Sequence, residues 1–425
     1  MLAPALSALV LVRRRLIPLL FVLYVVAYLD RVNVSFAAAG MEADLGLTAA
    51  AYGLGAGIFF LGYFLFEVPS NLMLRRFGAR RWIARILVTW GILSGLNAFV
   101  TNEWQFYLVR FLLGVAEAGF FPGIILYLTY WVPRAERART TSLFLTATAV
   151  AGLVGAPLSG VLLSMDGFLG LQGWQWLFIV EAIPAVVLGF VVWRILPDSP
   201  REARWLTPDQ REGLDAMVAA DAADARATER LGAAFRSARV WLLAILYLAI
   251  VIGFYGISLW LPLIIGRNLP ELSPLGLGLV TAIPYACAVI AMVAIGRSSD
   301  ARSERRWHLS IPLAVGAIGL VVAGTTGSLV AFLAICVATA GIYAALGPFW
   351  TLPPAFLRGA AAAAGIAWIN SIGNLGGFLG PYTLGRITDS AGGVGLGLVV
   401  LGAIAGVSAI LGWVTATIVQ RRHAA

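Results

Sequence analysis

Long apolar stretches alternate with short polar segments along most of the chain. Each apolar stretch is close to the ~20 residues that an α-helix needs to cross ~30 Å of hydrocarbon. Twelve of them fall near residues 16–39, 50–74, 81–100, 104–131, 139–164, 174–196, 239–266, 273–297, 308–325, 328–350, 359–387 and 393–420. The pattern predicts an all-α membrane protein with twelve transmembrane helices.

The two halves of the chain repeat each other at a nearly constant offset. Arg80-Arg81-Trp82 recurs as Arg305-Arg306-Trp307, Pro122 recurs as Pro348, and Gly155–Pro157 matches Gly380-Pro381. Three anchors in the same order indicate a duplicated unit, which predicts two pseudo-symmetric six-helix bundles with a substrate site between them at the membrane midplane.

The longest polar segment lies at the centre of the chain and separates the two predicted bundles. We therefore divide the sequence into an N-terminal bundle at 1–196, a cytoplasmic central loop at 197–238 and a C-terminal bundle at 239–425.

Charge is scarce and unevenly distributed. Only 12% of the residues are charged and 60% are hydrophobic, against about 25% charged in soluble proteins, so we expect a lipid bilayer around the chain. All 30 basic residues are arginines; with the N-terminus inside, 25 fall in inner segments and 2 in outer ones. This bias places both termini in the cytoplasm and explains the net charge of +9 without a nucleic-acid partner.

Residues that bind metals or perform covalent catalysis are few. The two cysteines, Cys287 and Cys336, lie inside apolar segments, and the two histidines, His308 and His423, lie at a loop edge and in the tail. No zinc-type spacing, phosphate-binding loop or catalytic triad stands out. We predict no catalytic residues, no metal site and no cofactor.

Five ionisable residues fall well inside predicted spans, all in the first half: Asp30, Arg31, Arg110, Glu117 and Glu181. Charges at membrane depth are costly and therefore suggest function. Arg110 and Glu117 are seven residues apart, so they project from one helix face about 10 Å apart along the axis. With Asp30 and Arg31 at a similar height, a charged network facing the cavity is expected.

These residues suit proton-coupled transport of an anion. Arginine stays charged and offers a planar fork to a carboxylate. A buried glutamate such as Glu117 can pair with arginine or hold a proton, so its protonation frees the arginine for an anionic substrate. The alternative interpretation is a purely structural ion pair that holds spans one and four together, in which case Arg110 and Glu117 take no part in transport.

Several motifs resemble those of the major facilitator superfamily, and more narrowly its anion:cation symporter family of bacterial tartrate, phthalate and galactonate permeases. The matching segments are residues 74–81 (LRRFGARR), with Arg75 where the signature usually has Asp; 296–300 (GRSSD); 28–33 (YLDRVN); 67–71 (EVPSN); 110–123; 196–200 (LPDSP) with 205–207 (WLT); and 370–374 (NSIGN).

The resemblance implies roles for individual positions. Asp30 and Glu117 match the family's proton-coupling carboxylates, and Arg31 and Arg110 its charge-pairing or anion-contacting arginines. Tyr28 and Tyr63 match tyrosines of its binding cavity. The resemblance also implies a bacterial inner-membrane location.

Polar and aromatic residues elsewhere supply further candidate contacts. Asn370 and Asn374 share one face of their span and suit hydroxyl and carboxylate groups. Trp350 follows the Pro348 bend, and packing or substrate contact are equally compatible with it; Thr148 is a further candidate.

Two more carboxylates have other interpretations. We expect Glu67 to contact the arginine-rich loop after the second span, rather than to take part in transport. For Glu181, helix–helix contact and function both stay open.

We predict a monomeric secondary transporter that takes up a small organic anion, such as a hydroxycarboxylate or sugar acid, together with protons and driven by the proton gradient. The alternative is a proton-coupled efflux antiporter, although Ala156 interrupts the adjacent Gly-Pro pair typical of that class in the fifth span. An enzyme would need a nucleophile or metal set, and a channel would favour ring symmetry over a two-half repeat.

Overall fold

The computed structural model describes residues 2–226, 236–357 and 359–420, and these form helices and short connections without strands. The helices are α1 (Leu2–Leu45), α2 (Ala49–Phe77), α3 (Ala79–Leu96), α4 (Glu103–Glu117), α5 (Phe120–Leu128), α6 (Arg134–Leu163), α7 (Gly173–Ile195), α8 (Pro208–Arg226), α10 (Ala238–Ser258), α11 (Leu261–Asn268), α12 (Pro274–Arg302), α13 (Arg306–Thr325), α14 (Ser328–Ala344), α15 (Leu346–Trp350), α16 (Leu352–Phe356), α17 (Gly359–Ala391) and α18 (Gly395–Gln420), with three short 3₁₀ turns between them.

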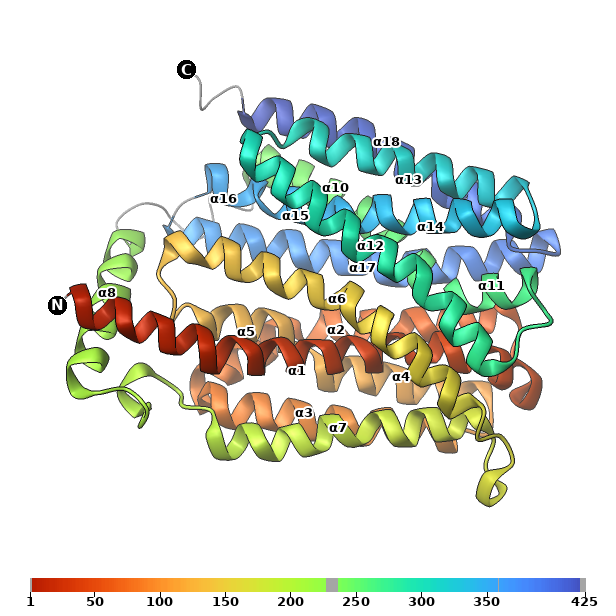
Figure 1. The fold of residues 1–425 in the computed structure, drawn as a ribbon, viewed down its shortest axis with the longest axis horizontal. Coiled ribbons are helices and arrows are strands. Elements are labelled where there is room, and N and C mark those ends of the chain that lie inside the picture. The colour runs from red at the N-terminus through yellow and green to blue at the C-terminus, as the bar shows by residue number, and fades with distance from the viewer. Residues whose placement is uncertain (1, 227–235, 358, 421–425) are drawn as a thin grey trace.

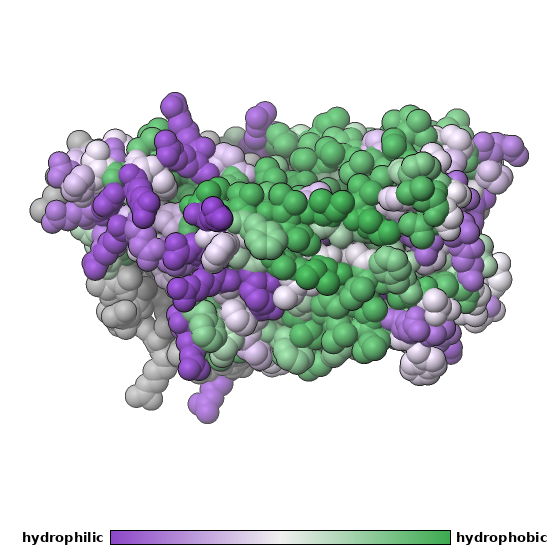
Figure 2. All heavy atoms as spheres, turned by 90° about the horizontal axis from the view of Figure 1, so that it is seen from below, coloured by the Kyte–Doolittle hydropathy of each residue, from purple (hydrophilic) through white to green (hydrophobic). Residues whose placement is uncertain are grey.

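Ten of the described spans are long and apolar enough to cross a membrane. In this count α4 and α5 form one span, and α14 forms one span with α15 and the start of α16. The long helices α1 and α17 complete the twelve. Large apolar side chains such as Phe190, Ile290 and Ile318 are exposed on the outside. Figure 2 shows the resulting apolar band between polar ends, which is the surface expected of a protein surrounded by lipid.

Each half packs mainly within itself. In the first half α3 packs on α7, α2 on α4, and α1 on both α6 and α7; in the second, α13 packs on α18 and α14, and α10 on α17. The halves meet along two helix pairs, α2 with α17 and α6 with α12. The start of α1, the end of α18 and α8 all lie at one end of the bundle (Figure 1), which we call the inner end.

Glycines allow the two halves to approach closely. A Cβ on Gly53 of α2 would lie 2.5 Å from the Pro381 carbonyl oxygen of α17, and one on Gly278 of α12 would lie 2.4 Å from the Ala156 carbonyl oxygen of α6. Small residues at such crossings bring backbones into van der Waals contact, which is the main source of helix association in lipid.

Three spans predicted as continuous are divided, the fourth near its middle and the other two closer to one end. The fourth breaks at Ala118–Gly119, the seventh at Leu259–Trp260 and the tenth at Ala345. The first of these breaks directly follows Glu117, the last residue of α4. Such breaks are tolerated in a membrane where the freed backbone groups are enclosed by protein.

The ends of the predicted segments also differ from the structure. The apolar pattern predicts the first span at 16–39, whereas α1 begins at Leu2 and includes Arg13–Arg15. The central segment contains helix α8, which packs on α1; Gln210 Nε2 donates to Ser7 Oγ at 3.0 Å. Arg358 and the basic tail lie outside the described residues.

Gly119→Ala is expected to lower stability. Gly119 has φ 80°, where a Cβ costs about 1–2 kcal/mol, and that Cβ would lie 2.6 Å from Ser70 Oγ. Gly167→Ala is the matched control, because Gly167 has φ 78° but open space around its Cβ position. The melting temperature of purified protein in detergent should fall further for Gly119→Ala; equal losses would show that the Ser70 contact contributes nothing.

Candidate functional site

A small cavity lies between the two halves, near the middle of the helices that enclose it. Its lining comes from α1, α2, α5 and α6 of the first half and α10, α15 and α17 of the second: Tyr24, Arg31, Tyr63, Phe121, Leu145, Thr148, Tyr247, Val251, Phe254, Tyr255, Leu346, Asn370 and Asn374. Its volume of about 40 Å³ accommodates a few water molecules. An organic anion therefore needs some of these side chains to move.

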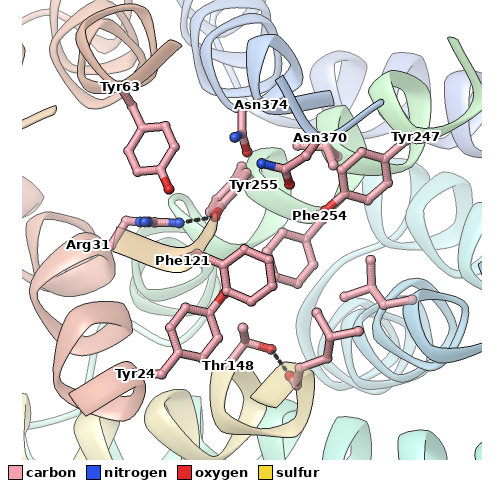
Figure 3. Close-up of a pocket in the computed structure, with 13 residues that line it drawn as sticks. Tyr24, Arg31, Tyr63, Phe121, Thr148, Tyr247, Phe254, Tyr255, Asn370 and Asn374 are labelled. Atoms are coloured by element: carbon pink, nitrogen blue, oxygen red, sulfur yellow. Dashed lines mark hydrogen bonds between the residues drawn. The ribbon is translucent and has the colours of Figure 1, made fainter. Parts of the chain in front are cut away.

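Arg31 supplies positive charge to this cavity. Its Nη2 forms an ion pair with Glu117, and its Nη1 donates to the Tyr255 hydroxyl at 2.8 Å (Figure 3). The guanidinium carbon lies 5.4 Å from the Phe59 ring centroid and 5.3 Å from that of Tyr63. Arg31 is only 6% exposed, so its charge is held by one carboxylate, one hydroxyl and aromatic faces.

The position of Glu117 is electrostatically unfavourable for a negative charge. It is fully buried at the last residue of α4, where the partial negative charge of the helix C-terminus disfavours a carboxylate. The ion pair with Arg31 offsets this. The arrangement makes the charge of Glu117 depend on whether Arg31 is available.

Arg110 lies elsewhere than predicted. Its Nε and Nη2 donate long hydrogen bonds of 3.4 Å to the carbonyl oxygens of Gly55 and Ala56 on α2, and its guanidinium carbon lies 5.1 Å from the Phe59 ring centroid. It is completely buried and does not line the cavity. Arg110 is therefore not part of the predicted charged network at the cavity in this conformation: Arg31 forms the ion pair with Glu117, and Arg110 lies against the backbone of α2.

Asp30 and Arg31 point in different directions, as consecutive helical residues must. The Asp30 carboxylate accepts hydrogen bonds from Trp90 Nε1 at 2.8 Å and Ser94 Oγ at 3.0 Å, both on α3. Asp30 therefore lies inside the first half, away from the cavity that Arg31 enters, and the single four-charge network expected from the sequence does not form.

Tyr28 is part of a hydrogen-bonded chain on the outer side of the cavity. Its hydroxyl lies 3.3 Å from that of Tyr343, which lies 2.8 Å from Ser258 Oγ. Further towards the outer end, the Asp389 carboxylate on α17 accepts from the first backbone N–H groups of α2 at 2.9–3.0 Å. These contacts join the halves between the cavity and the outer end.

The other predicted contact residues are distributed around the cavity. Tyr63, Thr148, Asn370 and Asn374 line it (Figure 3), although the Thr148 hydroxyl donates within its own helix at 2.7 Å. Trp350 does not line it and instead packs edge-on against Tyr247, with ring centroids 4.9 Å apart.

Glu67 contacts the second half rather than the arginine loop, so the sequence prediction for it is wrong. Its two carboxylate oxygens accept from Asn370 Nδ2 at 2.9 Å and Ser371 Oγ at 3.0 Å, both on α17. Glu181 accepts from Ser159 Oγ at 3.0 Å and joins α7 to α6 within the first half.

Sequence reasoning missed the aromatic side chains of the cavity. Tyr24, Phe121, Tyr247, Phe254 and Tyr255 all line it. Tyrosines inside apolar spans were a usable signal, because a buried hydroxyl needs a hydrogen-bond partner. Tyr255 provides such a group to Arg31 from the second half.

Comparisons with known proteins agree with this architecture. The model of the Major Facilitator Superfamily matches residues 20–381. A putative tartrate transporter of Agrobacterium vitis is 49% identical over 93% of this chain and 92% of its own length. A quinolone resistance transporter of Acinetobacter baumannii is 44% identical over 92% and 90%, respectively.

Solved structures show the same fold at low sequence identity. A bacterial homologue of the human lysosomal transporter Spinster, in an inward-facing and unoccupied conformation, matches with a TM-score of 0.78 and 17% identity over 96% of this chain and 98% of that one. The inward-open xylose transporter XylE of E. coli matches with 0.74 and 16% over 94% and 95%. The predicted twelve-helix, two-bundle fold is confirmed, and the chain belongs to the major facilitator superfamily of membrane transporters, not to an enzyme family.

Proposed function

We propose that this protein imports a small organic anion, such as a tartrate-like hydroxycarboxylate, together with protons by alternating access. The observation that carries the proposal is the Arg31 guanidinium in a cavity between the halves, with its charge paired to the buried Glu117. The similarity to putative tartrate transporters supports an anionic substrate.

In this proposal, the substrate and Glu117 compete for one arginine. A substrate carboxylate offers Arg31 the same partner as Glu117. Once displaced, Glu117 is a buried carboxylate at a helix C-terminus without its cation, and a proton removes that unfavourable charge. Anion binding and proton binding then favour each other, which is the thermodynamic requirement for symport.

Proton coupling also offsets the electrical work of moving an anion against the membrane potential. An anion entering a negatively charged cytoplasm is opposed by ~2.3 kcal/mol per charge per 100 mV. One accompanying proton cancels this for a monoanion. We place the protein in the bacterial inner membrane as a monomer with both termini in the cytoplasm.

We assign the remaining predicted residues to direct substrate contact, to proton binding or to support of these residues. Tyr63, Asn370 and Asn374 contact the substrate from the cavity wall, with Thr148 available after a rotamer change. Asp30, held by neutral donors on α3, is the second proton site. Tyr28 and Trp350 support this arrangement through Tyr343 and Tyr247, and Arg110 acts through Phe59 and the backbone of α2.

Glu117→Gln should abolish proton-driven accumulation but preserve exchange of substrate present on both sides, because glutamine cannot alternate between a charged and a protonated form. Proteoliposomes with an acidic exterior and a labelled organic acid measure both. Glu103→Gln at the exposed outer end of the same helix is the control and should accumulate normally. Undiminished accumulation by Glu117→Gln would contradict the coupling role.

Arg31→Lys should weaken substrate binding at least about tenfold with little loss of stability, because an ammonium cannot replace the planar fork. Arg110→Lys should lower the melting temperature while leaving affinity nearly unchanged, because Arg110 does not line the cavity. Thermal melting of both variants with and without organic acids separates the effects. Lost affinity in a stable Arg110→Lys protein would instead support direct substrate contact.

Proton-coupled efflux is the second candidate function, favoured by the 44% identity to a quinolone resistance transporter. The same Arg31–Glu117 pair would then exchange protons for an outgoing compound. Quinolone susceptibility of cells expressing the protein distinguishes the two functions. Resistance that disappears in Glu117→Gln, without organic-acid uptake by the wild type, would favour efflux.

A further inference from the structure

Glu67 is a buried carboxylate that the proposed transport cycle does not use. It lies on α2, one helical turn inward from the cavity residue Tyr63, and is 2% exposed. Its partners on α17 are Asn370 and Ser371, and the Asn374 amide also interacts with it. Among the residues that the structure describes, no basic side chain forms an ion pair with Glu67.

The partners of Glu67 are also groups of the cavity. Asn370 and Asn374 line it, so the amides available to a substrate are engaged by a carboxylate of the protein. Arg31 is engaged in the same way by Glu117. The cationic and amide donors of the cavity are therefore both held by carboxylates from the first half.

We propose that Glu67 is an internal substitute for a second carboxylate of the substrate. This inference rests on the proposed function and extends it to a substrate class: a small hydroxylated dicarboxylate. One substrate carboxylate takes Arg31 from Glu117, and the other takes the Asn370 and Asn374 amides from Glu67.

Displacement of Glu67 is linked to a proton. The displaced carboxylate would remain buried, close to a substrate carboxylate of like charge and without the donors that stabilised it. A hydronium ion of the bulk solution supplies the proton: one of its O–H bonds breaks, leaving water, as the O–H bond of the Glu67 acid forms and removes that charge. The other charged or titratable groups around Glu67 are Arg31 on α1, Tyr63 on α2 and Tyr247 on α10. Of these only Arg31 is a cation, and the incoming dianion engages it.

A monocarboxylate that binds Arg31 alone leaves Glu67 in place. Dicarboxylate binding should therefore take up one more proton through Glu67 than monocarboxylate binding does. Glu67→Gln should abolish this difference while preserving the contacts to α17, since glutamine still offers an acceptor to Asn370.

The experiment counts protons taken up per bound ligand by calorimetry of the purified full-length protein in buffers of different ionisation enthalpy. L-tartrate is the dicarboxylate and D-glycerate the matched monocarboxylate. Glu67→Gln should take up one proton fewer than wild type with tartrate and the same number with glycerate. Asp389→Asn, at the outer end of the same helix pair, should leave both counts unchanged.

Ser371→Ala provides a second variant should Glu67→Gln fail to fold. It removes one donor from Glu67 but keeps both cavity amides, so the carboxylate is already partly protonated in the empty carrier. Proton uptake with tartrate should then fall below the wild-type value.

Equal tartrate counts in wild type and Glu67→Gln, or the same deficit with glycerate, overturn the role of Glu67 and leave the proposed function standing. Wild-type protein that takes up no proton with either acid, or binds neither, overturns the proposed function itself.

Discussion

The ion pair between Arg31 and Glu117 is the interaction on which the rest of the site depends. Neither charge is stable alone at this depth, because removing one partner leaves the other buried and uncompensated. Both partners are held within the first half: Arg31 among aromatic rings, and Glu117 at the end of α4. Such a pair is stable when formed. It can be exchanged when an anion takes the place of Glu117 as the partner of Arg31 and a proton neutralises Glu117.

The packing of the halves makes this exchange possible. Glycine-mediated crossings of α2 with α17 and α6 with α12 close the interface tightly, while the breaks in three spans fall near the cavity. The glycine-mediated crossings hold the two halves in a defined conformation without polar contacts. The breaks in the helices place a side chain such as Glu117 at a helix terminus instead of along a continuous face.

Much of the fold could be predicted from the sequence, because lipid demands long apolar runs and any charge inside one stands out. The repeat anchors and the buried charges of the first half follow from this. The choice of Arg31 over Arg110 as the partner of Glu117 could not be predicted. Spacing along one helix relates Arg110 to Glu117, but which side chain of a neighbouring helix approaches the carboxylate depends on packing.

Glu67 illustrates a second limit. The predicted span ends at residue 74, near the arginines, whereas α2 continues to Phe77. Ten residues of helix rise about 15 Å, which separates Glu67 from the loop beyond Phe77. Its partners come from α17, more than three hundred positions away along the chain. Only the close crossing of α2 and α17 makes that contact available.

The distribution of charge between the halves has a mechanical consequence. Arg31 and Glu117 belong to the same half, so rotation of one half against the other leaves their ion pair intact. The Arg31 bond to Tyr255 and the Glu67 bonds to Asn370 and Ser371 cross between the halves, and such a rotation must break or rearrange them. Proton and anion exchange can thus occur within a rigid first half. The second half responds to this exchange because its neutral hydroxyl and amide groups gain or lose their hydrogen bonds to Arg31 and Glu67. Neutral partners suit this position, because they separate without leaving a second buried charge behind.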